Sequence, residues 1–223
     1  MRTQAKPKAV DGPAAFAEAF KVPRETIHRL ERYAELLAHW QKITNLVASS
    51  TLPALWSRHF ADSAQLAKLA PDARLWLDLG SGAGFPGLVV AIINAGKADF
   101  RMHLVEANAK KCAFLSEVAR ATEAPVTVHA SRIEALAEST DRPTPEVISA
   151  RALAALPQLL ALAAPLFAPD TRGLFLKGRE AQSELDAARE AWTFDAGLHP
   201  SLTAKDAHIV EITKLRPRAA RAP

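Results

Sequence analysis

Cysteine is almost absent from the chain, since Cys112 is the single one among 223 residues. One cysteine excludes an intrachain disulfide and a zinc site built from several cysteines. Low cysteine usage is also typical of proteins kept in a reducing compartment. We therefore expect no metal, and we expect a cytoplasmic protein.

Long apolar runs are missing as well. No stretch reaches the roughly 18 apolar residues that a membrane-spanning helix needs. The N-terminal residues carry Arg2, Lys6 and Lys8 but no apolar segment, which argues against a secretory signal there. We expect a soluble protein that makes no membrane contact and acts as a monomer.

A strong excess of one charge is also lacking. The chain has 28 Lys and Arg against 24 Asp and Glu, a formal net charge of +4. This mild basic excess is compatible with a polyanionic partner but does not require one. The hydrophobic fraction of 49% is sufficient to bury a sizeable core. At this length we expect one α/β core with a short additional element.

Short apolar runs and helical patterns alternate in the larger, C-terminal part of the chain. This alternation predicts a doubly wound α/β fold with a mostly parallel sheet. A sixth strand is expected at 207–213, and the helical pattern before it covers 180–192. The five runs expected to form the parallel strands are 75–79, 102–106, 126–129, 147–150 and 174–177.

Two helical patterns precede the first of these strands. Residues 24–42 carry apolar side chains every three or four positions, as in an amphipathic helix. Thr51 and Pro53 are typical of the start of a second helix. We expect four segments: a disordered arm (1–13), an N-terminal helical extension (14–70), a Rossmann-like domain (71–215) and a basic tail (216–223).

A glycine cluster follows the first predicted strand, at Gly80, Gly82, Gly84 and Gly87. Glycine allows the backbone to turn sharply and to approach a ligand closely. The helix that follows presents free N–H groups at its start. The next strand ends in Glu106, whose carboxylate would lie beside the loop and hold a ribose by its hydroxyls. The sequence therefore predicts a nucleotide-like ligand at this strand end.

Two ligand classes fit this loop. Residues 82–87 satisfy the glycine pattern of dinucleotide-binding proteins. S-adenosylmethionine is favoured because the first glycine directly ends the strand after Asp78 and Phe85 replaces the third glycine. Pro86 would also remove an N–H from a pyrophosphate site. The fold does not define the substrate, so a small-molecule methyltransferase, a dinucleotide-dependent oxidoreductase and a non-catalytic RNA-binding module stay open at this point.

Six collinear segments carry a more specific signal. They are Trp40-Gln-Lys-Ile-Thr-Asn45-Leu46, Arg58-His59-Phe60-Ala61-Asp62-Ser63, Leu77-Asp-Leu-Gly-Ser-Gly-Ala-Gly-Phe-Pro-Gly87, Ser131-Arg-Ile-Glu134, Ile148-Ser-Ala-Arg151-Ala152 and Leu176-Lys177-Gly178. Together they resemble the glucose-inhibited division protein B family, the bacterial small-subunit ribosomal RNA guanine-N7 methyltransferases. Departures from the family pattern stand at Gln41, Val47 and Ala150.

The resemblance implies the fold expected above and the transfer of a methyl group from S-adenosylmethionine to N7 of one guanine in 16S ribosomal RNA. The partner would be that RNA or the small ribosomal subunit. The residues expected at the cofactor are Gly80, Gly82, Gly84, Phe85, Glu106, Ile133, Glu134 and Arg151. The candidates for a catalytic role are Arg151, Asn45 and His59, and those for RNA contact are Arg58 and Lys177.

The expected chemistry needs no strong base. Guanine N7 has an exposed lone pair and carries no proton, so catalysis would rest mainly on holding the reacting atoms about 3–3.5 Å apart and in line. The predicted fourth strand runs into Ser149-Ala150-Arg151, which lacks the polar and aromatic constellation used for exocyclic amines. The target base must also leave its stack, which favours a flexible RNA element.

Overall fold

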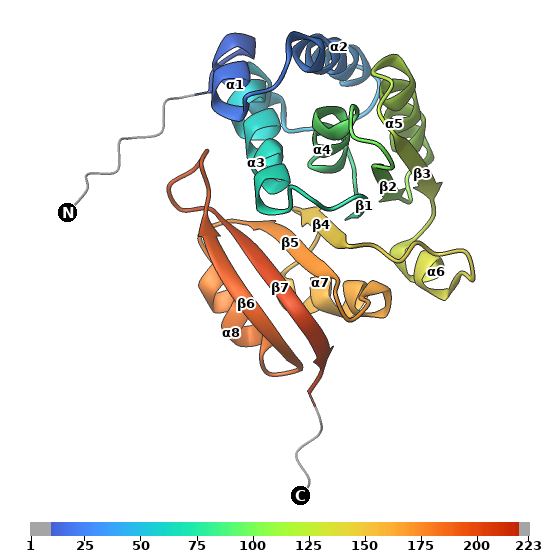
Figure 1. The fold of residues 1–223 in the computed structure, drawn as a ribbon, viewed down its shortest axis with the longest axis vertical. Coiled ribbons are helices and arrows are strands. Elements are labelled where there is room, and N and C mark those ends of the chain that lie inside the picture. Colours follow the sequence, from blue (N-terminus) through green and yellow to red (C-terminus); the bar gives the residue numbers. More distant parts are fainter. Residues whose placement is uncertain (1–9, 219–223) are drawn as a thin grey trace, which may run out of the picture.

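The computed structural model describes residues 10–218. Its centre is a seven-stranded sheet with the order β3-β2-β1-β4-β5-β7-β6. The first five strands are parallel, and β7 pairs antiparallel with both β5 and β6. The strands are β1 (Leu75–Leu79), β2 (Arg101–Glu106), β3 (Val126–Ala130), β4 (Val147–Arg151), β5 (Arg172–Lys177), β6 (Trp192–Pro200) and β7 (His208–Pro217). This is the predicted doubly wound, mostly parallel α/β fold (Figure 1).

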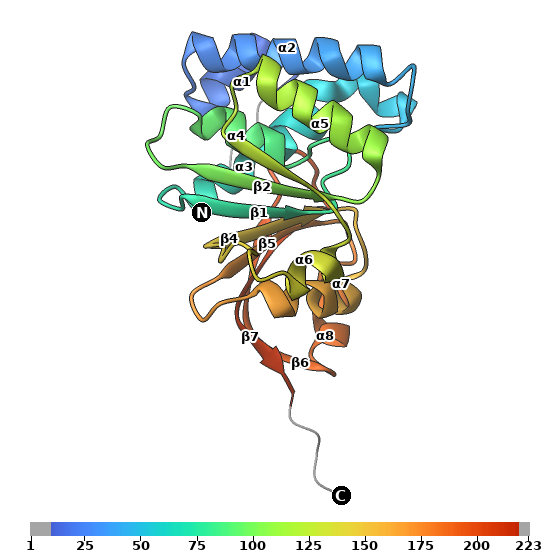
Figure 2. The same cartoon turned by 90° about the vertical axis from the view of Figure 1, so that its right-hand side faces the viewer.

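Helices cover both faces of the sheet (Figure 2). The bounds are α1 (Pro13–Phe20), α2 (Arg24–Trp40), η1 (Ser49–Ala54), η2 (Trp56–Ala61), α3 (Asp62–Leu69), α4 (Gly87–Asn94), α5 (Ala109–Ala121), α6 (Ile133–Glu138), α7 (Leu156–Ala163), η3 (Ala164–Leu166) and α8 (Ala181–Ala188). One face packs against α4 and α5, the other against α6, α7 and α8. Within residues 10–218, no helix combines the length and apolar character needed to cross a bilayer.

The N-terminal helices share their core with the sheet. Phe16 of α1, Tyr33 of α2 and Phe60 of η2 are fully buried in the same cluster as Leu88 of α4 and Phe114 of α5. Figure 2 shows α1 and α2 as the outermost layer, over α4 and α5. These helices therefore form part of the wall around the glycine loop that precedes α4.

Local sequence accounts for α5 and β1, whereas the region before α3 differs from the expectation. The side chain of Asn108 caps α5 by accepting from the backbone N–H groups of Lys110 and Lys111 at 3.0 and 3.1 Å. Strand β1 is an apolar run because it lies in the middle of a parallel sheet covered on both faces. The region expected to hold one helix from Thr51 is instead a 3-10 segment (η1) and a π-helical segment (η2) before α3.

Three expectations near the chain ends need correction. Pro13 is the first residue of α1, not part of an arm; residues 1–9 of the expected arm lie outside the described residues. The helix expected over 180–192 ends at Ala188, and Trp192 starts β6, which was not predicted. Arg216 and Pro217 belong to β7 and pair with β6, so the expected tail does not begin at 216. Arg218 follows β7 and is described, and residues 219–223 of that tail lie outside the described residues.

The sheet order places the site. Strands β1 and β4 are direct neighbours. From β1 the sheet continues through β2 and β3 towards one edge, and from β4 it continues through β5 towards the other. In open α/β sheets, ligands bind at the carboxyl ends of the strands beside such a reversal. Gly80 follows β1, Glu106 ends β2, Arg151 ends β4 and Lys177 ends β5, so all four lie along this edge.

Candidate functional site

The glycine loop between β1 and α4 is held in a conformation that requires glycine. Gly80, Gly82 and Gly84 have φ values of 62°, 55° and 88°. A Cβ at Gly80 would come within 2.6 Å of Leu153 Cδ1, and one at Gly84 would overlap Leu88. At Gly82 the nearest atom is the Gly80 carbonyl oxygen, 3.7 Å away. A side chain at Gly80 or Gly84 would therefore meet neighbouring side chains, whereas the α-carbon of Gly82 is uncovered.

Glu106 lies directly beside this loop. Its Oε2 accepts a hydrogen bond from the Gly82 N–H at 2.9 Å, and its Oε1 accepts one from the Asn108 N–H at 2.8 Å. The carboxylate thus bridges the loop after β1 and the turn after β2. The structure confirms that these two sequence features, 24 residues apart, meet at the carboxyl edge.

Asp78 supports the loop from below. Its carboxyl group is fully buried, and its Oδ1 accepts a hydrogen bond from the Ser149 hydroxyl at 2.7 Å. Burial raises the pKa of Asp78 to about 6, against the opposing effects of hydrogen bonds from Ser149, Ser81 and Gly87. The buried Asp78 therefore links β1, just before the loop, to Ser149 of β4.

Phe85 connects the loop with the neighbouring cleft. Its ring stacks on Tyr33 of α2 and on His59 of η2, with centroids 5.3 and 4.8 Å apart. The Arg151 guanidinium lies 4.9 Å from the centroid of the same ring. The Tyr33 hydroxyl donates to the carbonyl oxygen of Ala83 in the loop. Side chains from the N-terminal helices therefore hold both the loop and its aromatic residue.

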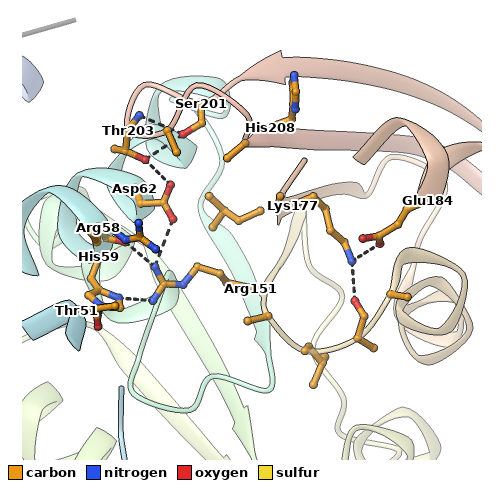
Figure 3. Close-up of a pocket in the computed structure, with 18 residues that line it drawn as sticks. Thr51, Arg58, His59, Asp62, Arg151, Lys177, Glu184, Ser201, Thr203 and His208 are labelled. Atoms are coloured by element: carbon orange, nitrogen blue, oxygen red, sulfur yellow. Dashed lines mark hydrogen bonds and ion pairs between the residues drawn. The ribbon is translucent and has the colours of Figure 1, made fainter. Parts of the chain in front are cut away.

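Arg151 is held by a dense set of contacts at the end of β4 (Figure 3). Its Nη1 donates to the carbonyl oxygen of Arg58 at 3.1 Å and to Asp62 Oδ2 at 3.3 Å. Its Nη2 lies 2.7 Å from His59 Nδ1. The planar guanidinium satisfies these partners simultaneously, which a lysine ammonium cannot do. Arg151 is thus a preorganised cation, with only 17% of its side chain exposed.

The protonation state of His59 follows from these contacts. Arginine can only donate, so His59 Nδ1 must accept and Nε2 must carry the proton. Nε2 lies 2.8 Å from the Thr51 hydroxyl, which itself donates to the Ala48 carbonyl oxygen at 2.6 Å. Burial, with the positive charges of Arg151 and Arg58, lowers the pKa of His59 to about 4. His59 is a neutral acceptor that orients Arg151.

This depressed pKa predicts a pH-dependent stability. Unfolded His59 titrates near its ordinary pKa of 6.5, whereas the folded residue does so near 4. Between these values only the unfolded chain binds the proton, so the free energy of unfolding falls as the pH drops from 6.5 towards 4. Urea unfolding at pH 7 and pH 5 measures this change. Between these pH values the free energy of unfolding should fall less for His59→Gln than for the unchanged protein. Equal losses of unfolding free energy would contradict the assignment. Burial also lowers the pKa values of His103 and His129, but these residues contribute to both proteins alike.

A cleft of about 660 Å³ opens beside Arg151, on the β4 and β5 side of the glycine loop (Figure 3). This volume suits a nucleotide-sized group. Its walls come from η1, η2 and α3, from the ends of β4 and β5, from α8 and from the loop between β6 and β7. The polar lining residues are Thr51, Arg58, His59, Asp62, Arg151, Lys177, Glu184, Ser201, Thr203 and His208.

Arg58 and Lys177, the residues expected to contact RNA, differ in their surroundings. The Arg58 side chain is exposed at the cleft. The Lys177 side chain is only 8% exposed, and its ammonium pairs with Glu184 at 2.7 Å and donates to the Ala154 carbonyl oxygen at 2.6 Å. Glu184 also accepts from the Leu156 N–H, at the start of α7. Lys177 is therefore engaged within the cleft wall.

The other expected residues lie farther along the edge or outside the cleft. Ile133 is buried and Glu134 exposed at the start of α6, just after β3. Asn45 is exposed, accepts from Gln41 Nε2 at 3.3 Å and is not among the cleft-lining residues. Gln41 itself orders the turn after α2, because its Oε1 accepts from the N–H groups of Leu46 and Val47.

The chain after β5 contributes cleft residues that were not predicted. Ser201, Thr203 and His208 line the cleft, yet β6 was not predicted and no motif marks its loop. Glu184 was missed as well, because a glutamate on an amphipathic helix gives no signal by itself. Among the described residues, no group of three or more histidine, cysteine or carboxylate side chains is placed to hold a metal ion.

Comparisons with known proteins agree with this geometry. The model of the GidB family, described as rRNA small subunit methyltransferase G, matches residues 26–213. Proteins named "Ribosomal RNA small subunit methyltransferase G" include one from Parvibaculum lavamentivorans, 51% identical over 94% of this chain and 92% of its own length. Another, from Methylobacterium nodulans, is 54% identical over 88% of this chain and 92% of its own length. These matches support the ribosomal RNA interpretation and not the small-molecule alternative.

Solved structures share the fold at low sequence identity. An O-methyltransferase from Bacillus cereus in complex with S-adenosylhomocysteine has a TM-score of 0.60 and 15% identity, over 89% of this chain and 96% of the other. A putative O-methyltransferase from Klebsiella pneumoniae has a TM-score of 0.56 and 16% identity, over 83% and 89% of the two chains. These likenesses show the methyltransferase fold, and the sequence matches are far closer. The chain belongs to the rRNA small subunit methyltransferase G family.

Proposed function

We propose that this protein transfers the methyl group of S-adenosylmethionine to N7 of one guanine in 16S ribosomal RNA. Family membership supports the reaction class and the RNA. The site assignment rests on the contact between the glycine loop and the cleft beside it. Phe85 of the glycine loop stacks under Arg151 of the cleft, so a ligand on the loop and a base in the cleft would be neighbours.

The loop side fits the cofactor. The uncovered α-carbon of Gly82 allows a ligand to approach the backbone, and the Glu106 carboxylate has the chemistry to accept from ribose hydroxyls. Gly80 and Gly84 maintain the loop conformation. Further along the edge, we assign the adenine to the start of α6, with Ile133 as an apolar surface and the backbone at Glu134 beside it.

The cleft side fits a reaction that needs positioning and no proton abstraction. When bound, the cofactor supplies a methyl group made electrophilic by its sulfonium. Both ring nitrogens of His59 are occupied, by Arg151 and Thr51, so His59 is not available as a base. Guanine N7 has no proton to remove, which agrees with this arrangement. Arg151 would hold the purine in line with the methyl group.

The RNA side of the proposal rests on Arg58, the exposed cation at the cleft, which would contact a phosphate. We assign Lys177 to the cleft wall, where it orders Glu184 and the loop after β4. Asn45, outside the cleft, would act only through the turn that follows α2. A ribosomal RNA substrate also implies action in the cytoplasm, and we propose that the protein acts there as a monomer.

The product is tested by chemical mapping. Purified protein and S-adenosylmethionine are incubated with small ribosomal subunits, and with their deproteinised RNA, from cells lacking this chain. Because N7-methylguanosine has a weakened glycosidic bond, borohydride and aniline should cleave the RNA at one new guanine. Methyl incorporation without cleavage would overturn the N7 assignment, and no incorporation into either substrate would overturn the proposed RNA substrate. Omission of S-adenosylmethionine provides the control for background cleavage.

A further inference from the structure

The loop between β6 and β7 is attached to α3 by several hydrogen bonds. Gln65 of α3, only 3% exposed, directs its amide group to this loop. Its Oε1 accepts from the Leu202 N–H at 2.9 Å, and its Nε2 donates to the Ser201 hydroxyl at 3.3 Å. The Thr203 hydroxyl donates to Asp62 Oδ1 at 2.8 Å. Three successive loop residues are therefore fixed on one helix.

This attachment places the loop at the cleft. Ser201 and Thr203 line the cleft, and Figure 3 shows both beside Asp62. Asp62 in turn pairs with Arg151, so the loop, α3 and the reacting edge form one connected unit. Fixing the loop in this way removes freedom that would otherwise be lost when a ligand binds.

Leu202 is the residue between these two cleft-lining side chains, and its own side chain is 49% exposed. Its backbone is fixed while its apolar side chain is presented to solvent. The exposed cation Arg58 lies at the same cleft, and the exposed Lys205 follows three residues later in the loop. Exposed apolar and cationic side chains beside a nucleotide-sized cleft are suited to contact with bases and phosphates together.

A base that enters the cleft leaves a gap in its stack. Removing a base from a stack costs a few kcal/mol, and nucleic-acid-binding proteins often offset this cost by inserting an apolar side chain between bases. We propose that Leu202 is a stacking wedge that fills the space vacated by the target guanine when that base enters the cleft. The inference rests on the proposed function, since it requires an RNA base as the group in the cleft.

Leu198 provides a matched control for the test. It lies on β6 of the same hairpin, and its side chain is 37% exposed. Unlike the neighbours of Leu202, its neighbours in the chain, Gly197 and His199, do not line the cleft. Leu198→Ala removes the same atoms from the same hairpin without altering the proposed wedge. Leu202→Phe is the conservative variant, because an aromatic ring also stacks on bases.

The experiment measures single-turnover methyl transfer to small ribosomal subunits and to their deproteinised RNA, both from cells lacking this chain. Leu202→Ala should slow transfer about tenfold or more, the scale set by the cost of unstacking one base. Its affinity for S-adenosylmethionine, measured by calorimetry, should equal that of the unchanged protein. Leu198→Ala should transfer at the unchanged rate, and Leu202→Phe should retain most of it.

The outcomes separate the wedge from the proposed function. If the unchanged protein transfers methyl groups and Leu202→Ala is as fast as Leu198→Ala, the wedge is overturned while the function stands. Equal slowing by Leu202→Ala and Leu198→Ala also overturns the wedge, because the effect then belongs to the hairpin as a whole. If the unchanged protein methylates neither substrate, the proposed function itself is overturned.

Discussion

Gly82→Ala is expected to weaken S-adenosylmethionine binding at least about a hundredfold, because the added methyl group would occupy the surface that the ligand approaches. In the protein alone this methyl group meets only the Gly80 carbonyl oxygen, at 3.7 Å, so the chain has room for it. The positive φ of 55° should cost about 1–2 kcal/mol of stability. Calorimetry of cofactor binding and thermal unfolding of the same sample measure the two effects separately.

Gly96→Ala is the control for adding a methyl group outside the loop, at a glycine whose φ is not positive. A Cβ at Gly96 meets nothing within 4 Å, and Gly96 lies after α4, away from the loop. Gly84→Ala would be a poor test, because its Cβ would overlap Leu88 and disturb the fold itself. A folded Gly82→Ala protein with unchanged cofactor affinity would show that the ligand does not approach this loop.

Arg151→Lys is expected to lower the single-turnover rate of methyl transfer about 100- to 1,000-fold, the scale of removing one preorganised donor from an active site. Lysine keeps the charge but cannot bond to His59 Nδ1 and Asp62 together while covering the Phe85 ring. The cation would therefore lose its position beside the base. Rapid-quench measurement at saturating cofactor and RNA separates this effect from weaker binding.

Arg101→Lys controls for the loss of a guanidinium as such. Arg101 begins β2, at the edge of the sheet opposite the site, and donates to the Phe100 carbonyl oxygen at 2.7 Å. This variant should transfer methyl groups at the unchanged rate. If Arg151→Lys were within about threefold of Arg101→Lys, we would conclude that ordinary positive charge, and not the fixed guanidinium, is what the site needs.

Local patterns in the sequence determined most of the sheet. The five predicted parallel strands are confirmed, and each could be recognised because a helix follows it along the chain, as in a βαβ unit. Strand β6 was not predicted, because no helix separates it from β7. It is an edge strand with mainly exposed side chains, and its burial does not follow the regular alternation of a half-buried strand. Its pairing with β7 becomes visible only in three dimensions.

The candidate site divides in the same way. The glycine loop and the acidic residue after β2 could be recognised from sequence, because their spacing along one βαβ unit determines that they meet. The partners of Arg151 could not be predicted, since Asp62 lies 89 residues away and Thr203 reaches Asp62 across 141 residues. Polar contacts over such separations leave no periodic signal. They depend on how the N-terminal helices and the β6–β7 hairpin pack around the sheet. The sequence therefore determined the glycine loop and named several residues of the cleft, and only the tertiary structure decided how the cleft residues are joined to one another.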